Sequence, residues 1–296
     1  MNKAIGILLS LLMITVLSAC NMEQQITDSS VTSSSENCQE HQLITSFDAE
    51  NKMRISIPKA NLDNVYVRDA SAEEKLDENT YGQVFLLADD QILDEGDIAD
   101  HYLVIASNDG ITVEDISTAC YDGEIALCDF DGDGDKEILL QETVGASGGA
   151  GQYASRVLNF VEGELVEIFS YDAAQKNWNA TGFSITILPD KEFLIENRFT
   201  DYSEAFRLED RSEDYFREYW YDNNGNPKDL DLWVDSFYEF LPTDIDADGV
   251  YEIVCRQYAA LTCHADGIGC AKTVLQYNKD TGAFDVIRSA FELNCD

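Results

Sequence analysis

The sequence carries one acidic pattern twice. Residues 129–137 read DFDGDGDKE and residues 244–252 read DIDADGVYE, with acidic side chains at alternate positions. In both places an apolar stretch follows, then a loop rich in small residues, and then two more stretches of β-forming residues separated by a turn. A unit of short strands and turns that recurs along a chain is typical of repeated antiparallel β-sheets. The pattern therefore predicts a repetitive β-architecture.

The rest of the sequence agrees with a mostly β fold. Short stretches rich in β-formers, for example 83–87, are separated by turn residues. We predict antiparallel blades of a small or partial β-propeller-like domain with few short helices. Regions 82–116 and 183–210 are expected to form further strand groups without the acidic loop, and a short helix is expected near 70–78 or 211–219.

Each acidic loop offers oxygen ligands for one metal ion. Counted from its first aspartate, each loop has carboxylates at positions 1, 3, 5 and 9, glycine for a sharp turn at 6, and a main-chain carbonyl at 7. About six to eight oxygen donors fit Ca²⁺, whereas Mg²⁺ prefers a tighter octahedron. Position 12 is Leu140 or Cys255, so the loops are not EF-hands, which carry a bidentate glutamate there. We expect about two calcium ions, held by Asp129, Asp131, Asp133, Asp135 and Glu137 and by Asp244, Asp246, Asp248, Val250 and Glu252.

The two loops resemble the D-x-D-G-D-G-x-x-[DE]-[ILV] loops of FG-GAP and VCBS-type repeats, which occur in integrin-like propellers and bacterial surface proteins. The loop His-Ala-Asp-Gly-Ile-Gly at 264–269 is also similar to secreted VCBS-like lipoproteins of Gram-positive bacteria. The resemblance implies that calcium is structural and pins blades together. Two features depart from the pattern: Ala247 stands where glycine is usual, and the chain has only two such loops.

The N-terminus has the layout of a lipoprotein signal. Lys3 precedes an apolar run that ends in Leu-Ser-Ala-Cys, which resembles the bacterial lipobox and implies lipidation of Cys20. We predict a signal peptide over 1–19, a polar, serine-rich tether over 20–44, and a β-rich repeat domain over 45–296. The protein is expected outside the cytoplasm, anchored by lipid to a bacterial membrane, with a Gram-positive cell surface favoured.

The net charge and the cysteines limit which partners, disulfides and metal sites the protein can have. The net charge of −38 repels nucleic acid, so no nucleic-acid partner is expected. An exported chain favours disulfides, and seven cysteines follow Cys20, so at least one is free or pairs with another molecule. The preferred pairs are Cys120 with Cys128 and Cys263 with Cys270. No pair has C-x-x-C spacing, which argues against a structural zinc site.

Catalytic patterns are weak. Gly145-Ala-Ser147-Gly-Gly fits G-x-S-x-G, but the nucleophile elbow needs a helix after the serine, and this sequence continues with glycine and a strand. Three histidines are present: His41 falls in the predicted tether, His101 begins a strand, and His264 could form an acid–base or metal pair with Asp266. Aromatic residues could form a sugar-stacking surface, although core packing is the favoured role for most of them; they are Trp178, Trp220, Trp233, Tyr215, Phe216, Tyr219 and Tyr221.

These observations favour a membrane-anchored extracytoplasmic lipoprotein whose calcium-stabilised domain is a binding or surface-interaction module. We expect a binding module rather than an enzyme, with no catalytic residue assigned and an extracellular ligand that is a polysaccharide or a protein. The alternative is a secreted hydrolase acting on polysaccharide or peptide polymers on the same scaffold. A third interpretation is that the protein is a purely structural component of the cell envelope. An exposed pocket that brings His264 or Ser147 close to a carboxylate and a second base would favour the enzyme.

Overall fold

The structure, a computed structural model, describes residues 43–47, 52–88, 100–116, 120–147, 150–172, 182–230 and 232–293. The chain divides into two units, Met1–Cys38 and Gln39–Asp296, and all described residues belong to the second. Cys20, His41 and Trp178 lie outside the described residues. The described chain is mostly strand, arranged in antiparallel sheets, as the sequence predicts.

The N-terminal sheet has six strands in the order β1-β2-β3-β4-β5-β6. Its strands follow one another along the chain, each paired with the next. A 3-10 turn, η1 (Pro58–Ala60), links the second strand to the third. The bounds are β1 (Ile44–Phe47), β2 (Met53–Ile57), β3 (Leu62–Asp77), β4 (Thr80–Ala88), β5 (His101–Ser107) and β6 (Gly110–Asp115).

The segment 70–78 is not a helix, contrary to one of our two expectations. Residues 70–77 belong to β3 and pair with β4 in the register Ala70↔Phe85 and Lys75↔Tyr81. The residues favour a helix locally, but Leu76 is fully buried in the core of the sheet. Helix propensities of such residues differ from one another by only roughly a few tenths of a kcal/mol. Burial in the sheet therefore outweighs the local preference for a helix.

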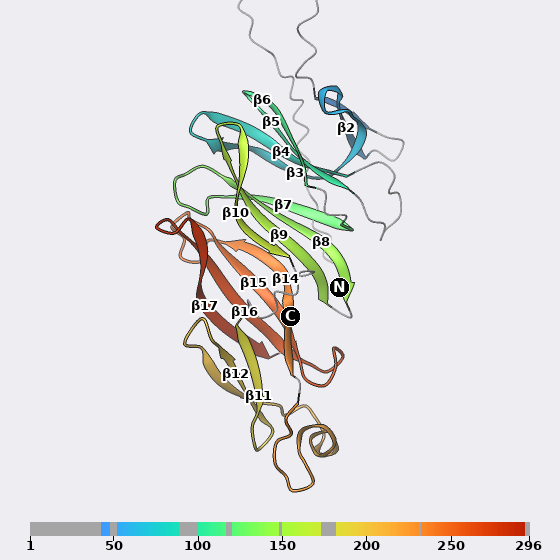
Figure 1. Ribbon diagram of the computed structural model, residues 1–296, viewed down its shortest axis with the longest axis vertical. Helices are drawn as coiled ribbons and strands as arrows, with labels where there is room; N and C mark the ends of the chain where they lie inside the picture. Colours follow the sequence, from blue (N-terminus) through green and yellow to red (C-terminus); the bar gives the residue numbers. More distant parts are fainter. Residues whose placement is uncertain are drawn as a thin grey trace, which may run out of the picture. The chain divides into compact units, whose positions relative to one another are not determined.

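The repeated unit forms two four-stranded antiparallel meanders, shown as separate twisted sheets in Figure 1. Each acidic loop connects the first strand of its meander to the second, and the three later strands match the repeated sequence pattern. Four-stranded meanders are the sheets from which propeller blades are built. The first comprises β7 (Asp122–Cys128), β8 (Glu137–Ser147), β9 (Ala150–Val161) and β10 (Glu164–Asp172), and the second β14 (Trp233–Thr243), β15 (Glu252–Ala260), β16 (Gly267–Asn278) and β17 (Ala283–Leu293).

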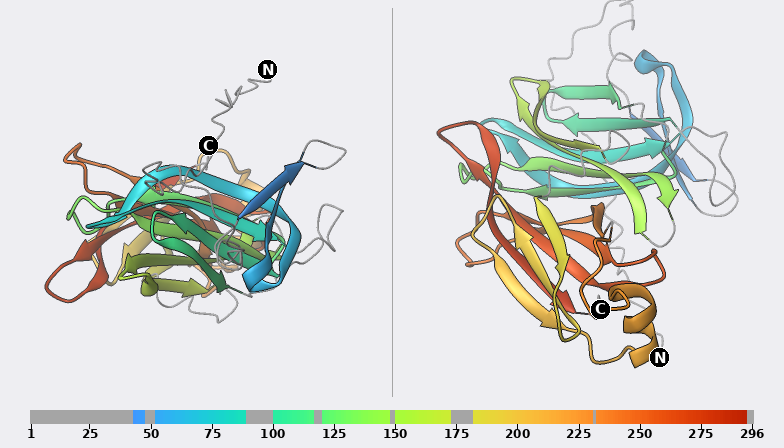
Figure 2. Two further views of the ribbon diagram at one scale, coloured as in Figure 1. Left: turned by 90° about the horizontal axis from the view of Figure 1, so that it is seen from above. Right: turned by 60° about the horizontal axis from the view of Figure 1, so that its bottom comes forward.

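A smaller sheet and a helical segment lie between the meanders in sequence. The sheet has the order β11-β12-β13, with bounds β11 (Phe183–Ile187), β12 (Glu192–Asn197) and β13 (Ser203–Arg207). The helical segment consists of α1 (Glu213–Tyr215) and the π-helical turn η4 (Phe216–Trp220). Ser212 begins it, since its hydroxyl accepts from the amide of Tyr215. This confirms the expected helix near 211–219 (Figure 2).

Hydrophobic clusters join successive sheets. Leu86 and Leu103 of the six-stranded sheet share a cluster with Ile138 and Leu158 of the first meander. The first meander packs in turn on the second through a cluster that includes Phe130, Leu139, Tyr171, Phe240, Ile253 and Leu275. The three-stranded sheet and the helical segment share a cluster with the second meander that includes Phe193, Trp220, Ala259 and Phe291. The sheets are therefore coupled by buried apolar contacts, consistent with blade-like packing.

The preferred disulfide pairs are wrong. Cys120, Cys128 and Cys263 are free, and Cys270 forms a disulfide with a different cysteine. The first pair fails because β7 separates its two cysteines by roughly 20 Å of extended chain, whereas bridged Cα atoms lie within about 7 Å. Cys263 is exposed, whereas Cys270 is buried inside β16 beside the hydroxyl of Tyr238 at 3.0 Å.

No helix in the part of the chain that the structure describes has the length and apolar character that a membrane crossing needs.

Candidate functional site

Acidic loop 1, residues 129–137, connects β7 to β8 and is folded around its own carboxylates. The two oxygens of Asp129 accept from the amides of Gly132 at 2.6 Å and Gly134 at 2.9 Å. Gly132 and Gly134 have φ of +72° and +91°, a region that glycine enters without steric cost. Asp133 accepts from the amide of Asp135 at 2.8 Å. The glycines thus let the chain wrap so that two loop amides point at the carboxylate of Asp129.

Glu137 is the most unusual side chain of loop 1. It is fully buried, and its Oε2 accepts from the amide of Phe130 at 2.7 Å. Its Oε1 is also buried and has no hydrogen-bond partner. Burial, with added repulsion from Asp131 and Asp133, raises the pKa of Glu137 to about 7. A buried carboxylate oxygen without a partner is costly unless a proton or a cation satisfies it.

Glu137, which carries this unpartnered oxygen, belongs to a cluster of three carboxylates. One ligand oxygen from each of Asp129, Asp131 and Glu137 lies within 4.8 Å of the others. Oxygens that share one calcium ion lie at most about 5 Å apart, because each Ca–O distance is about 2.4 Å. Burial and the neighbouring Asp133 also raise the pKa of Asp131. The donor set, its spacing and its uncompensated charge therefore fit a Ca²⁺ ion.

Acidic loop 2, residues 244–252, connects β14 to β15 and shares most of the hydrogen-bond scheme of loop 1. Asp244 accepts from the amides of Asp248 and Gly249, both at 3.1 Å. The Oε2 of Glu252 accepts from the amide of Ile245 at 3.2 Å, as Glu137 does from Phe130. Ala247 adopts φ +62°, at the position that glycine occupies in loop 1. The two loops are therefore structural equivalents, as their sequences predict.

The glutamate of loop 2 has a different environment. The Oε1 of Glu252 accepts from the side-chain amide of Gln276 at 3.0 Å, so neither of its oxygens lacks a partner. The clustered oxygens of loop 2 come instead from Asp244, Asp246 and Asp248, of which the last two are exposed. Loop 2 therefore presents a more open and more hydrated set of ligands than loop 1.

The two loops contact each other. The amide of Tyr251 donates to the carbonyl of Asp129 at 2.7 Å. A methyl group placed on Gly132 would come within 2.9 Å of the Val250 side chain. A cation held in loop 1 would therefore stiffen a segment that bonds directly to the second meander.

Among the carboxylates predicted as ligands, those of Asp133 and Glu252 lie outside these clusters, which consist of side-chain oxygens and do not bear on the main-chain carbonyls predicted at position 7. Asp133 stands outside the cluster of loop 1, and the carboxylate of Asp135 forms an ion pair with Lys75 of β3. Val250 donates its amide to Asp248 at 2.8 Å, and its side chain lies against loop 1. Sequence reasoning missed Lys75 and Gln276, because both are distant in the chain and neither belongs to a motif.

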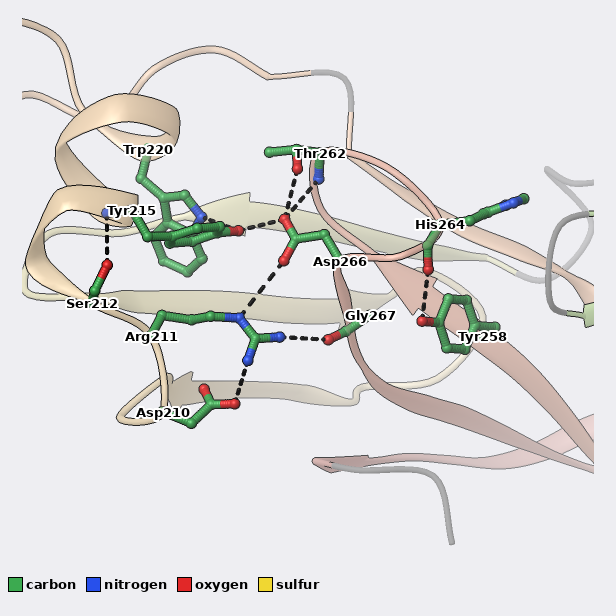
Figure 3. Close-up of polar contacts among 10 residues, drawn as sticks. All are labelled: Asp210, Arg211, Ser212, Tyr215, Trp220, Tyr258, Thr262, His264, Asp266 and Gly267. Carbon is green, nitrogen blue, oxygen red and sulfur yellow. Dashed lines mark hydrogen bonds and ion pairs between the residues drawn. The ribbon is translucent and has the colours of Figure 1, made fainter.

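His264 and Asp266 do not act as a pair. The Nε2 of His264 lies 3.0 Å from the carboxylate of Asp235 in β14, and its ring points away from Asp266 in Figure 3. Asp266 instead accepts from Tyr215 and from both the amide and the hydroxyl of Thr262, with the Nε of Arg211 at 3.7 Å. These bonds tie the helical segment to the loop before β16. Burial and Asp266 both raise the pKa of Tyr215.

The serine candidate and the described aromatic candidates occupy different settings: strands, the core and, for Tyr219, the exposed surface. Gly145 and Ser147 lie in β8 and pair with β9, so the serine is followed by a strand rather than by the helix of a nucleophile elbow. Trp220 is fully buried in the core, as favoured for most of the aromatic residues. Trp233 lies 5.7 Å from the His264 ring, centre to centre.

Comparison with known proteins gives a partial match. The sequence model of a family described as YybI C-terminal domain matches residues 183–292, less than half of the chain; the match includes loop 2 and excludes loop 1. No curated protein matches the chain. A solved structure of MPT-1, a GDP-Man-dependent mannosyltransferase from Leishmania mexicana, aligns at 12% identity over 77% of this chain and 69% of that chain, with a TM-score of 0.22. A likeness at that score carries no inference.

Proposed function

We propose that the chain is an extracytoplasmic lipoprotein, anchored to a bacterial membrane through Cys20, whose β-domain binds calcium and serves as a binding or surface-interaction module. The observation that carries the calcium part is the buried, unpartnered Oε1 of Glu137 beside Asp129 and Asp131. The lipoprotein part rests on the sequence Leu-Ser-Ala-Cys after an apolar run. The binding role remains a proposal from the resemblance to FG-GAP and VCBS-type repeats.

In this proposal calcium is structural. The ion satisfies a carboxylate that the fold has already buried and offsets the repulsion among its neighbours. Loop 1 bonds to Tyr251 of the second meander, so an ordered loop 1 holds two sheets in register. Extracellular calcium modules bind at about 10⁻⁴ to 10⁻³ M, which suits a protein exposed to extracellular calcium.

Thermal melting of metal-stripped protein tests the calcium site. Calcium should raise the Tm, and magnesium at the same concentration should raise it less. Glu137→Gln keeps the size of the side chain and should remove most of the calcium effect. Glu167→Gln, at an exposed position of β10, is the matched control and should keep it. An unchanged Tm on calcium titration would sink the proposal.

Mass analysis of the mature N-terminus tests the anchor. A diacylglyceryl group on Cys20 and release of the protein from the membrane fraction by Cys20→Ser are the expected results. A mature chain that begins elsewhere and carries no lipid would contradict the anchor while leaving the calcium site untouched.

A hydrolase is a second candidate, favoured by one observation. Asp235 is buried and lies 3.0 Å from the half-exposed imidazole of His264. A carboxylate in this position orients an imidazole as a general base, and the rings of Trp233 and Tyr258 lie beside it. Incubation with polysaccharide and peptide polymers decides the matter. Turnover that His264→Gln abolishes would support a hydrolase, whereas binding without turnover would support the module.

A further inference from the structure

A second cluster of metal-ligating side chains lies away from the acidic loops. It consists of His101, the first residue of β5, Cys120, which precedes β7, and Glu142 in β8. All three side chains are buried, with exposures of 0%, 0% and 1%. His101 belongs to the six-stranded sheet, whereas Glu142 belongs to the first meander. The cluster therefore bridges two sheets at a buried point.

The ligand atoms of the cluster converge on one place. Cys120 Sγ lies 2.6 Å from His101 Nδ1 and 3.4 Å from Glu142 Oε1, and the last two atoms are 3.7 Å apart. Around a tetrahedral zinc ion, bonds of about 2.0 to 2.3 Å place such atoms about 3.3 to 3.6 Å apart. The sulfur–oxygen separation of 3.4 Å falls within that range, and the nitrogen–oxygen separation of 3.7 Å lies just above it. The sulfur–nitrogen separation would have to open by about 1 Å.

The surroundings hold the carboxylate in a ligand position. Arg156 donates to Glu142 Oε2 at 3.0 Å and to the carbonyl of Ile116 at 3.2 Å. This contact leaves Oε1 directed at the thiol and the imidazole. Partners that orient a metal ligand through its other polar atom are a regular feature of metal sites. Arg156 also offsets one negative charge, so a thiolate and a carboxylate can share the site with a dication.

The donor set selects the kind of ion. One sulfur, one imidazole nitrogen and one carboxylate oxygen suit zinc and similar first-row ions, whereas calcium takes oxygen alone. Three protein ligands leave one tetrahedral position for a small molecule such as water. The absence of C-x-x-C spacing does not exclude this site, because each ligand comes from a different strand region.

We propose that His101, Cys120 and Glu142 bind one divalent transition-metal ion of the zinc class, which fastens the six-stranded sheet to the first meander. On binding, the thiol of Cys120 gives its proton to solvent and the thiolate sulfur bonds to the metal. His101 binds as the neutral imidazole through Nδ1, with its proton on Nε2. No electron is transferred. The site shares no residue with loop 1 or loop 2.

Cobalt(II) is a suitable probe, since a cobalt–thiolate bond gives a charge-transfer band in the near ultraviolet and tetrahedral cobalt absorbs in the visible. The full chain is titrated with cobalt in excess calcium, which occupies the carboxylates of the acidic loops. We expect one cobalt ion per chain with the thiolate band, and its displacement by zinc. Cys120→Ser should lose the band. Cys128→Ser, at another buried free thiol, and Cys263→Ser, at the exposed one, should keep it.

X-ray absorption of the zinc-loaded chain keeps the test decisive should Cys120→Ser fail to fold. One sulfur and several nitrogen or oxygen neighbours, unchanged in Cys128→Ser and Cys263→Ser, would support the site. A coordination shell without sulfur would overturn it. So would a thiolate band that survives in Cys120→Ser or disappears in Cys263→Ser. Glu137→Gln should leave the cobalt–thiolate band intact. A failure of the transition-metal proposal can therefore be told apart from a failure of the calcium proposal.

Discussion

Acidic loops 1 and 2 share one backbone scheme but differ in what surrounds their glutamates. In both, the first aspartate accepts from the amide at position 6 and the glutamate accepts from the amide at position 2. Glu137 keeps one buried oxygen without a partner, whereas the same oxygen of Glu252 accepts from Gln276. One sequence motif therefore sets the fold of the loop, and residues from other strands set its charge balance.

The difference carries an energetic expectation. Loop 1 concentrates negative charge in a buried place, so its metal-free form is under electrostatic strain that calcium relieves. Loop 2 has exposed carboxylates and a glutamate whose two oxygens both accept hydrogen bonds. Water can therefore solvate these carboxylates and screen their repulsion without an ion. We therefore expect calcium to stabilise the protein mainly through loop 1.

The largest expected effect is a pH dependence of the metal-free protein. The folded pKa of Glu137 is raised to about 7 from its ordinary value of 4.5, which serves as the unfolded value. A group with a raised folded pKa contributes its full stability below the unfolded pKa and loses it as pH rises through the folded pKa. Unfolding free energy should therefore fall by up to about 3 kcal/mol between pH 4.5 and 7.5, as measured by chemical denaturation in chelator.

Two controls isolate that dependence. Glu137→Gln should flatten the decline, whereas Glu252→Gln in loop 2 should leave it in place. Saturating calcium should reverse the slope, because the metal binds the ionised carboxylate. An equal decline in the Glu137→Gln chain would show that the difference between the loops lies elsewhere.

The second prediction compares Asp131 with Asp246, which occupy position 3 of their loops. In calcium, Asp131→Asn should lower the unfolding free energy by roughly 2 kcal/mol, the size expected when calcium stands at about thirty times its Kd. In chelator the same change should slightly stabilise the protein, because it removes one of several repelling charges. Asp246→Asn should change stability by less than about 1 kcal/mol in either condition. Equal effects of the two changes would abolish the distinction between the loops.

The third prediction concerns position 4, where loop 1 has Gly132 and loop 2 has Ala247. Both residues have positive φ, which favours glycine. Gly132→Ala should cost about 1 to 2 kcal/mol, since its methyl group would also meet the Val250 side chain at 2.9 Å. Ala247→Gly should stabilise slightly, by about 0.5 kcal/mol, since it relieves the positive φ. Thermal melts of both chains in calcium would measure this, and a stabilising Gly132→Ala would contradict the description of the contact between the loops.

The sequence predicts the acidic loops well because their chemistry is local. Alternating aspartates, glycine at position 6 and a closing glutamate all act within nine residues, so spacing alone indicates how the chain wraps. The strands that follow each loop are confirmed for the same reason, since a short run of apolar, β-forming residues is recognised within one segment. The prediction of a helix near 70–78 was wrong because residues 70–77 pair with β4 and because Leu76 is buried in the sheet core.

The partners of the site were not predictable from the chain alone. Lys75, Gln276 and Asp235 reach their partners through sheet packing, and nothing beside them in sequence marks that role. The cluster of His101, Cys120 and Glu142 could not be predicted for the same reason, because its members come from different strand regions. The pairing of Cys120 with Cys128 failed for a related reason, because residues that are close in sequence along the extended strand β7 are far apart in space.

The smallest expected effect tests whether Gln276 accounts for the difference between the glutamates. Gln276→Ala removes the amide that satisfies Glu252 Oε1 and should make loop 2 more like loop 1. Gln276 is exposed, so water can replace the bond and the cost in chelator should be about 0.5 kcal/mol. The calcium-dependent gain in stability should rise by a similar amount, since the freed oxygen becomes available to the ion.

The readout is the difference between denaturation in calcium and in chelator, measured in the Asp131→Asn background so that loop 1 contributes little. Asn278→Ala, which removes the amide bonded to Asp285 at 2.8 Å, is the matched control and should leave that difference unchanged. An unchanged difference in Gln276→Ala would mean that the exposure of Asp246 and Asp248, rather than the satisfied glutamate, keeps loop 2 weak.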